Sequence, residues 1–334
     1  MNFGSSSRRG EYFDPVENCN LRIIGQTGRE GKGENQFSHP RGVCIDSETK
    51  EVFVVDCNNH RVIVYHLPSL AFVRQIGKGV IGFGSGTLNN SGGICIDTPT
   101  NQLFLADTNN HRIAVFNSKT GLHTRTIGGG PIQGSLFGQL SRPYGVCIDR
   151  GLLYVADYDN NRVQVFDKET GEALRIIGDG FGTGPGQLHS PITVTVDPTS
   201  ARLFVADYKN NRVQVYNTDT GLFLQTIGDV TNTAPENMMR GPRGLCFSLE
   251  ANLLFVSDRE NHRIQLFNLT SLAFIRHIGN LGQGTDITQF SRPMELCVSP
   301  GDGELIVVDG YNHRVKIIAV CFFRMFFSVC FSSL

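Results

Sequence analysis

Aspartate, asparagine, histidine and arginine recur together in six short segments of this 334-residue sequence. Each segment reads Asp-x-x-Asn-x-Arg, and successive copies start 50 or 51 residues apart. Such a set of side chains could bind a metal ion through His and Asp, or transfer protons through its carboxylates. The Asp and Arg pairs are Asp56 and Arg61, Asp107 and Arg112, Asp157 and Arg162, Asp207 and Arg212, Asp258 and Arg263, and Asp309 and Arg314.

The constant spacing favours a structural role for these segments. Catalytic sites are singular, whereas a group that is present in every repeat serves the repeat itself. We therefore predict that Asp accepts hydrogen bonds from free amides of a neighbouring loop and pairs with Arg across a hairpin. The Asn is expected to adopt the left-handed conformation that tight turns need.

Histidine at the fifth position of the segment raises the question of metal binding. Four copies carry it and two carry asparagine: His60, His111, His262 and His313, against Asn161 and Asn211. A closed ring of repeats would hold equivalent side chains apart and not within about 2 Å of one ion. The sequence therefore predicts no metal site and no cofactor.

The segments must be positioned by β-strands, because each repeat contains four short runs rich in Val, Ile and Phe. In the first repeat the expected strands are 42–46, 51–55, 61–65 and 72–76. This pattern predicts an all-β fold, a six-bladed β-propeller of four-stranded antiparallel blades. Residues 21–25 match the fourth strand of other repeats and 314–320 match a third strand. The N-terminal strand should then complete the last blade and close the ring.

Three regions follow from this assignment: an N-terminal extension, 1–20, expected to be disordered; the propeller, 21–320; and a Phe-rich tail, 321–334. The tail is too short to span a bilayer, and it either forms a short docked helix or is poorly ordered. The formal net charge of -1 gives no global field for DNA or anionic membranes. We expect a monomeric propeller.

The nine cysteines and the start of the chain favour a cytoplasmic location. The sequence has no CxxC pair and no long apolar stretch near Met1. Five cysteines occupy one position of the innermost strand, where a small residue packs between blades. They are Cys44, Cys95, Cys147, Cys246 and Cys297.

Enzyme chemistry should show at the mouth of the central channel, which we expect to be lined by the residues after each loop proline. These positions include one carboxylate, Glu295. A calcium site commonly takes more than one Asp or Glu, and acid–base catalysis commonly takes a carboxylate pair. No catalytic residue is assigned, and a metal-dependent lyase or lactonase is the least favoured function.

The repeats resemble the NHL repeat over about residues 21 to 320. The resemblance rests on the six hairpins and on segments that run from Gln-Phe or Gln-Leu to a proline, including 33–40, 138–143, 186–191 and 289–293. Similar propellers form the C-terminal part of TRIM-NHL proteins, which implies an interaction module, often for substrate recognition in ubiquitination or for RNA binding. The RING, B-box and coiled-coil parts of such ligases do not occur in this sequence.

Binding is expected on the face where the hairpins and the long loops between blades meet, because loops on a rigid scaffold collect binding residues. Tyr and Arg are enriched at protein-binding hot spots. The candidate partner-binding residues are Arg41, Tyr144, Tyr158, Tyr208, Lys209, Arg243, Arg259, Arg292 and Tyr311. Single-stranded RNA is the alternative partner, since Tyr can stack on bases. The acidic residues on the same face favour a protein or peptide.

Overall fold

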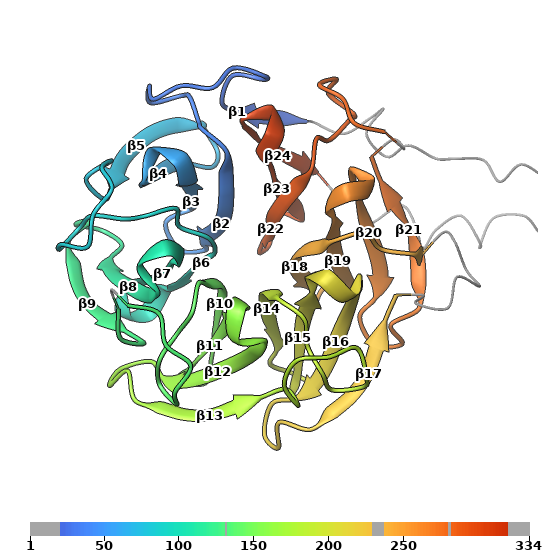
Figure 1. Cartoon of the computed structure of the whole chain (residues 1–334). Coiled ribbons are helices and arrows are strands. Elements are labelled where there is room, and N and C mark those ends of the chain that lie inside the picture. Colours follow the sequence, from blue (N-terminus) through green and yellow to red (C-terminus); the bar gives the residue numbers. More distant parts are fainter. Residues whose placement is uncertain (1–20, 131, 229–236, 280–281, 320–334) are drawn as a thin grey trace, which may run out of the picture.

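The computed structural model describes residues 21–130, 132–228, 237–279 and 282–319, and it forms a ring of six blades around a central axis (Figure 1). The fold class is as predicted. The expectations for 1–20 and 321–334 concern residues outside the described ranges. No helix in the described part of the chain is long and apolar enough to cross a membrane.

Each blade is a four-stranded antiparallel sheet whose first strand lies innermost. Blade one contains β2 (Pro40–Asp46), β3 (Glu51–Asp56), β4 (Arg61–His66) and β5 (Ala71–Ile76). Blade two contains β6 (Ile94–Asp97), β7 (Gln102–Asp107), β8 (Arg112–Asn117) and β9 (His123–Ile127). Blade three contains β10 (Pro143–Asp149), β11 (Leu152–Asp157), β12 (Arg162–Asp167) and β13 (Ala173–Ile177).

The other three blades repeat this order. Blade four contains β14 (Pro191–Asp197), β15 (Arg202–Asp207), β16 (Arg212–Asn217) and β17 (Phe223–Ile227). Blade five contains β18 (Pro242–Ser248), β19 (Leu253–Asp258), β20 (Arg263–Asn268) and β21 (Phe274–Ile278). Blade six contains β22 (Pro293–Ser299), β23 (Glu304–Asp309), β24 (Arg314–Ala319) and β1 (Arg22–Ile24).

The ring closes through β1, which pairs antiparallel with β24 from Arg22 opposite Ile317 to Ile24 opposite Val315. An ion pair of 2.7 Å between Arg22 and Glu304 ties β1 to β23 across the same sheet. Because the last blade takes its fourth strand from the start of the propeller, the third strand of that blade is not left as an open edge.

The core lies between neighbouring blades, where alternate residues of the two middle strands interdigitate. Each long loop adds one buried apolar side chain to the core. These side chains are Phe37, Leu88, Leu140, Leu188 and Phe290, with Met239 in blade five. The five inner-strand cysteines lie in β2, β6, β10, β18 and β22 as free thiols, and burial raises the pKa of each.

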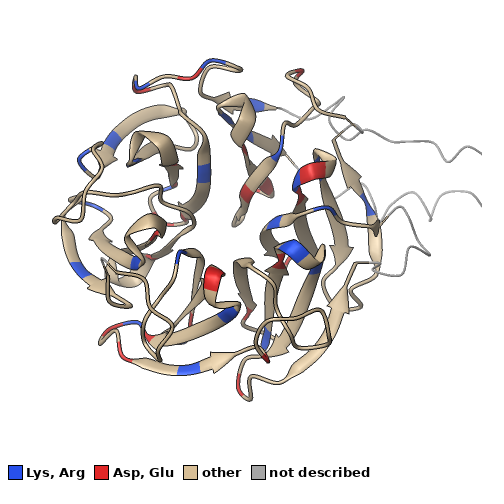
Figure 2. Ribbon diagram, viewed as in Figure 1, with Lys and Arg blue, Asp and Glu red and all other residues tan. Residues whose placement is uncertain are grey.

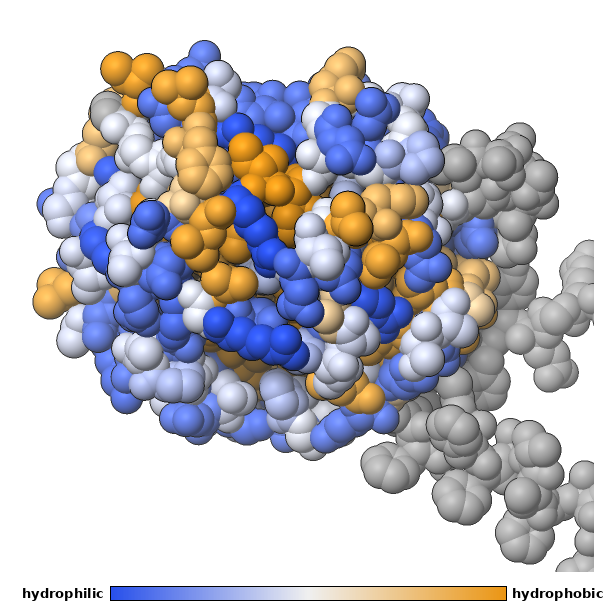
Figure 3. Space-filling view, turned by 90° about the horizontal axis from the view of Figure 1, so that it is seen from below, coloured by the Kyte–Doolittle hydropathy of each residue, from blue (hydrophilic) through white to orange (hydrophobic). Residues whose placement is uncertain are grey.

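The outer strands are less covered. Apolar side chains stand exposed on the rim of blades three and four, the side of the ring that Figure 3 shows, where apolar patches are interrupted by polar groups. Leu174 and Ile176 lie on β13, and Leu224 lies on β17, each more than two-fifths exposed.

Candidate functional site

The Asp of each repeated segment is the centre of a hydrogen-bond network. In blade one, Asp56 Oδ1 accepts a hydrogen bond of 2.7 Å from the backbone N–H of Ser38. Its Oδ2 accepts bonds of 2.8 Å from Asn59 Nδ2 and Arg61 Nε. Arg61 also donates to the carbonyl oxygen of Gly33, so one buried carboxylate joins the hairpin to the loop before the blade. The same contacts recur at Asp107, Asp157, Asp207, Asp258 and Asp309.

The Asn of the segment does not adopt the left-handed conformation that the sequence predicted for it. Asn59 is the last residue of the short 3-10 helix η1 (Cys57–Asn59), and the next residue, His60, has φ of 54°. The fifth residue is left-handed in all six copies. Asn59 instead uses its side-chain amide to reach Asp56 and the carbonyl of Gly31.

The fifth residue also links each hairpin to the next blade, a role that sequence reasoning missed. His60 Nδ1 accepts a hydrogen bond from the backbone N–H of Asn90, and Asn161 Oδ1 accepts one from Ser190. Both residue types supply one acceptor, which explains why Asn replaces His. The signal was in the sequence, where only His and Asn occupy this position. The other four links are His111 to Arg142, Asn211 to Gly241, His262 to Arg292 and His313 to His39.

The second residue of the segment differs in role from blade to blade. Cys57 and Thr108 are fully buried, and Thr108 Oγ1 donates to the carbonyl of Pro143 in the following blade. Tyr158 and Tyr208 are half-buried and pack on the core between blades four and five together with Tyr144. In the first two blades this position therefore contributes to packing.

The channel mouth on the loop face is built by the residues that follow the loop prolines. Arg41, Tyr144 and Arg243 occupy the same position on β2, β10 and β18, which belong to alternate blades. Their long side chains converge: the Arg41 and Arg243 guanidinium carbons lie 5.8 and 5.4 Å from the centroid of the Tyr144 ring. Arg41 also approaches the Tyr144 hydroxyl at 3.5 Å.

A second group of candidates lies on the neighbouring sector of the same face. Arg259 and Arg292 flank the ring of Tyr311, with guanidinium carbons 5.5 and 4.7 Å from its centroid. Glu260 pairs with both arginines, at 3.2 Å to Arg292. Figure 2 shows acidic and basic residues interspersed around the channel.

The remaining candidates lie around the first group. Tyr158 packs on Tyr144 with ring centroids 5.0 Å apart, and the guanidinium carbon of Arg142 lies 5.4 Å from the centroid of the Tyr158 ring. Tyr208 lies against Gly241, where an added Cβ would meet its ring at 2.8 Å. Lys209 is exposed at the third position of its turn. The structure thus gathers Arg41, Tyr144, Tyr158 and Arg243 at the mouth. Arg259, Arg292 and Tyr311 form an adjoining group, in which Arg259 is within electrostatic reach of Arg243, and Lys209 lies at the periphery.

Glu295 lies one residue deeper in the channel. Glycines in blades one and two make room for it, since a Cβ on Gly93 would lie 2.5 Å from Glu295 Oε1. Thr193 Oγ1 lies 3.5 Å from the same oxygen. Burial raises the pKa of Glu295 to about 7, although Arg243 and the amides of Val43 and Ile94 oppose this shift. The other five positions of this layer carry no acid, so no carboxylate pair forms here.

Within the described ranges, one group of potential metal ligands is found, and it lies at the ring seam between blades six and one. The ligand atoms of Glu30, His39 and His313 lie within 4.8 Å of one another. His313 Nδ1 already accepts the backbone N–H of His39, and Glu30 accepts the hydroxyl of Ser38. The sequence pattern groups His313 with the other hairpin histidines and gives no indication of Glu30 or His39. Hydrogen bonding within the seam accounts for this cluster.

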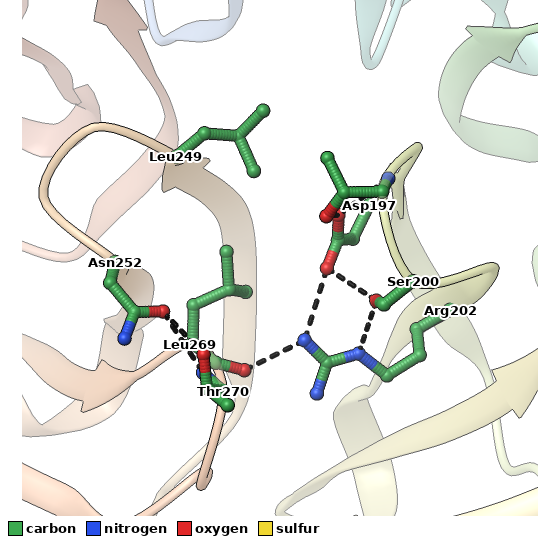
Figure 4. A pocket seen from close by; sticks show the side chains of 8 residues that line it. Asp197, Ser200, Arg202, Leu249, Asn252, Leu269 and Thr270 are labelled. Atoms are coloured by element: carbon green, nitrogen blue, oxygen red, sulfur yellow. Dashed lines mark hydrogen bonds and ion pairs between the residues drawn. The ribbon is translucent and has the colours of Figure 1, made fainter.

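The opposite face carries a pocket between blades four and five (Figure 4). Arg202 donates to Asp197 at 3.0 Å and to the carbonyl of Leu269 at 2.8 Å. Burial would raise the pKa of Asp197, but hydrogen bonds from Ser200, Thr199 and Arg202 outweigh it and lower the pKa to about 2. The polar groups of this pocket satisfy one another, so the pocket serves the junction of two blades.

Comparison with known proteins agrees with the repeated architecture. The family profile described as NHL repeat matches residues 37–65, 88–116, 140–166 and 239–267, which are parts of blades one, two, three and five. NHL repeat-containing protein 2 of Gallus gallus is 33% identical over 118 residues, covering 33% of this chain and 16% of that protein. The Bos taurus protein of the same name is 33% identical over 130 residues, covering 37% and 17%. The matches thus span about a sixth of these relatives.

Other similarities are more distant. Peptidyl-glycine alpha-amidating monooxygenase of Mus musculus is 32% identical over 111 residues, covering 32% of this chain and 11% of that protein. A solved structural genomics protein of unknown function from Bacteroides thetaiotaomicron has a TM-score of 0.68 at 16% identity, covering 90% of this chain and 76% of the other. A chain of a nidogen/laminin complex has a TM-score of 0.58 at 18% identity, covering 77% and 92%. These structures share the fold. The chain is therefore a six-bladed β-propeller in which four NHL repeats are detected.

Proposed function

We propose that this chain is a non-catalytic interaction module that binds a protein or peptide partner through its loop face. The observation that carries the proposal is that different residues of the repeat hold the blades together and line the loop face. The Asp, Asn, His and Arg side chains of the repeated segment form hydrogen bonds that hold the blades together. Tyrosines and arginines outside these hydrogen-bond networks gather around the channel mouth. Such residues on rigid loops are typical of binding hot spots.

Enzyme activity is less well supported. The channel offers Glu295 alone as an acid in its layer, and acid–base or calcium chemistry commonly requires further carboxylates. The similarity to a monooxygenase covers a third of this chain and a small part of that enzyme. A role as a substrate-recognition module in ubiquitination, and a cytoplasmic location, rest on the family resemblance and on the free thiols.

Single-stranded RNA is the second candidate partner, because arginine and tyrosine on one face can contact phosphates and stack on bases. Glu260 and Glu295 lie among these arginines and would weaken the attraction of a phosphate chain. The charge pattern therefore favours a protein or peptide.

The proposal is tested by affinity capture from cell lysate followed by quantitative mass spectrometry, with and without ribonuclease. The loop-face variant carries Tyr158→Ala and Tyr208→Ala, and the matched variant carries Leu174→Ala and Leu224→Ala on the outer rim. Thermal unfolding confirms that both variants are folded. We expect partners that resist ribonuclease and are lost with the loop-face variant only. Partners that disappear on ribonuclease treatment would favour RNA, and partners lost only with the rim variant would place binding elsewhere.

A further inference from the structure

We infer that the channel mouth formed by Arg41, Arg243 and Arg259 binds a carboxylate side chain of an acidic peptide segment. This inference rests on the proposed function and adds the chemistry of the partner. The site lies where β2 and β18 begin, beside the short helix η7 (Arg259–Asn261) of blade five.

Arg243 is the strongest indication that the mouth binds an anion. Its side chain is only 8% exposed, and it lies over the ring of Tyr144. Among the described residues Arg243 makes no direct hydrogen bond or close ion pair, although Glu295 lies within electrostatic reach and a guanidinium carries five N–H donors. Buried arginines are normally paired, because leaving such a charge unpaired is costly. Burial and the proximity of Arg41 lower the pKa of Arg243 to about 10, although Tyr144 and Glu295 oppose this shift.

The neighbouring arginines are also under-satisfied. Arg259 is 9% exposed, and its Nε is buried without an acceptor in the described structure. Arg41 has one long contact, of 3.5 Å, to a tyrosine hydroxyl. Arg259 shares Glu260 with Arg292, so that one carboxylate serves two guanidinium groups. Four arginines, Arg41, Arg243, Arg259 and Arg292, thus lie with two acids, Glu260 and Glu295, so the mouth holds more positive charge than its own acids neutralise.

The ligand is better matched by a peptide carboxylate than by nucleic acid. The ring of Tyr144 is flanked by Arg41 and Arg243, and that of Tyr311 by Arg259 and Arg292, so these faces are not free for base stacking. Glu260 on the rim and Glu295 below would repel successive phosphates. A single carboxylate can approach the guanidinium forks while the neutral peptide backbone passes over the rim.

The test uses fluorescence anisotropy with a fluorescein-labelled octapeptide of alternating Glu and Gly. The neutral control is the same peptide with Gln in place of Glu. Titration of the whole chain is compared for the wild type, Arg243→Met, Arg41→Met and Arg150→Met. Arg150 lies in the turn between β10 and β11 on the opposite face and is the matched loss of one positive charge. Arg41→Met removes a half-buried side chain and keeps the test informative if Arg243→Met does not fold.

We expect the Glu peptide to bind, the Gln peptide not to bind, and affinity to fall about tenfold or more with Arg243→Met or Arg41→Met but less than twofold with Arg150→Met. Equal effects of all three variants, or no binding of the Glu peptide, would overturn the inference. Tighter, Arg243-dependent binding of an oligouridine of equal charge would overturn it in favour of RNA. If the Glu peptide does not bind while captured partners still depend on Tyr158 and Tyr208, this inference is wrong but the proposed function is not contradicted.

Discussion

The backbone N–H of Asn90 donates a 3.3 Å hydrogen bond to Nδ1 of His60, which links the hairpin of blade one to the loop of blade two. Equivalent bonds join every pair of neighbouring blades, with His as acceptor in four cases and Asn in two. Nδ1 can accept this bond only when it carries no proton. The ring is therefore held by links that depend on pH at four of six junctions.

Acid should weaken the ring through these histidines. Burial lowers the pKa of His60, His111, His262 and His313 from 6.5. Protonation therefore favours the unfolded chain: their contribution to stability is fully present above about pH 6.5 and is lost as pH falls through the lowered pKa values. Changing all four to Asn, the residue that blades three and four use, should reduce the loss of melting temperature between pH 7.5 and pH 5. Circular dichroism melting checks this, and an unchanged loss would contradict the role of the histidines.

Removing the charge of one of the six repeated aspartates should be strongly destabilising. Asp157 is fully buried and accepts hydrogen bonds from Ser141, Asn160 and Arg162. Asp157→Asn would leave Arg162 without its ionic partner, which typically costs about 3 kcal/mol. Urea unfolding measures the free-energy change. Asp159→Asn, an exposed position of the same turn, is the control and should change stability by less than about 0.5 kcal/mol. Equal losses of stability in the two variants would contradict a special role of the Asp157 carboxylate.

Lys316→Gln should stabilise the protein. Lys316 is 1% exposed and donates to the carbonyl of Ile287, and burial lowers its pKa to about 7. Lys316 also donates to the carbonyl of Gln289. Gln164, Gln214 and Gln265 fill the same position in blades three to five and donate, without a charge, to the loop carbonyls equivalent to that of Gln289.

The sign for Lys316 follows from its lowered pKa. Between about pH 7 and the unfolded value near 10.5, the unfolded chain binds the additional proton, so stability rises with pH over that window. The destabilisation by the buried charge of Lys316 is fully present at about pH 7 and below. Lys316→Gln should therefore gain about 1–3 kcal/mol near pH 6 and less near pH 10. Chemical denaturation at the two pH values tests this, with Lys209→Gln as the exposed control; a gain independent of pH would count against the charge explanation.

The channel carboxylate should have the opposite pH dependence. Because burial raises the pKa of Glu295 to about 7, the unfolded chain releases its proton first as pH rises from about 4.5. Stability should fall between about pH 4.5 and 7 and then level off. Glu295→Gln, which keeps one acceptor oxygen, should be more stable than the wild type at pH 8 by about 1–3 kcal/mol and similar at pH 4.5. Melting temperatures across this range are the measurement, and a variant that is less stable at pH 8 would refute the assignment.

The sequence by itself determined the fold, because the Asp-x-x-Asn-x-Arg spacing and the four apolar runs per repeat are local patterns copied six times. It also determined the closure through residues 21–25, since that segment matches a fourth strand. The sequence predicted a strand over 42–46, but β2 begins at Pro40, which lies opposite Asp56 in the pairing with β3. The two additional residues lack apolar alternation, so the sequence pattern did not include them.

Only the tertiary structure decided which side chains meet across the ring. Arg41 and Arg243 are about 200 residues apart in the sequence, but closure of the ring brings both to the ring of Tyr144. The inter-blade role of His60 and the burial of Glu295 likewise depend on the neighbouring blade, which no local pattern encodes. Spacing specifies a repeat, whereas the environment of a side chain at the axis depends on how all six repeats close.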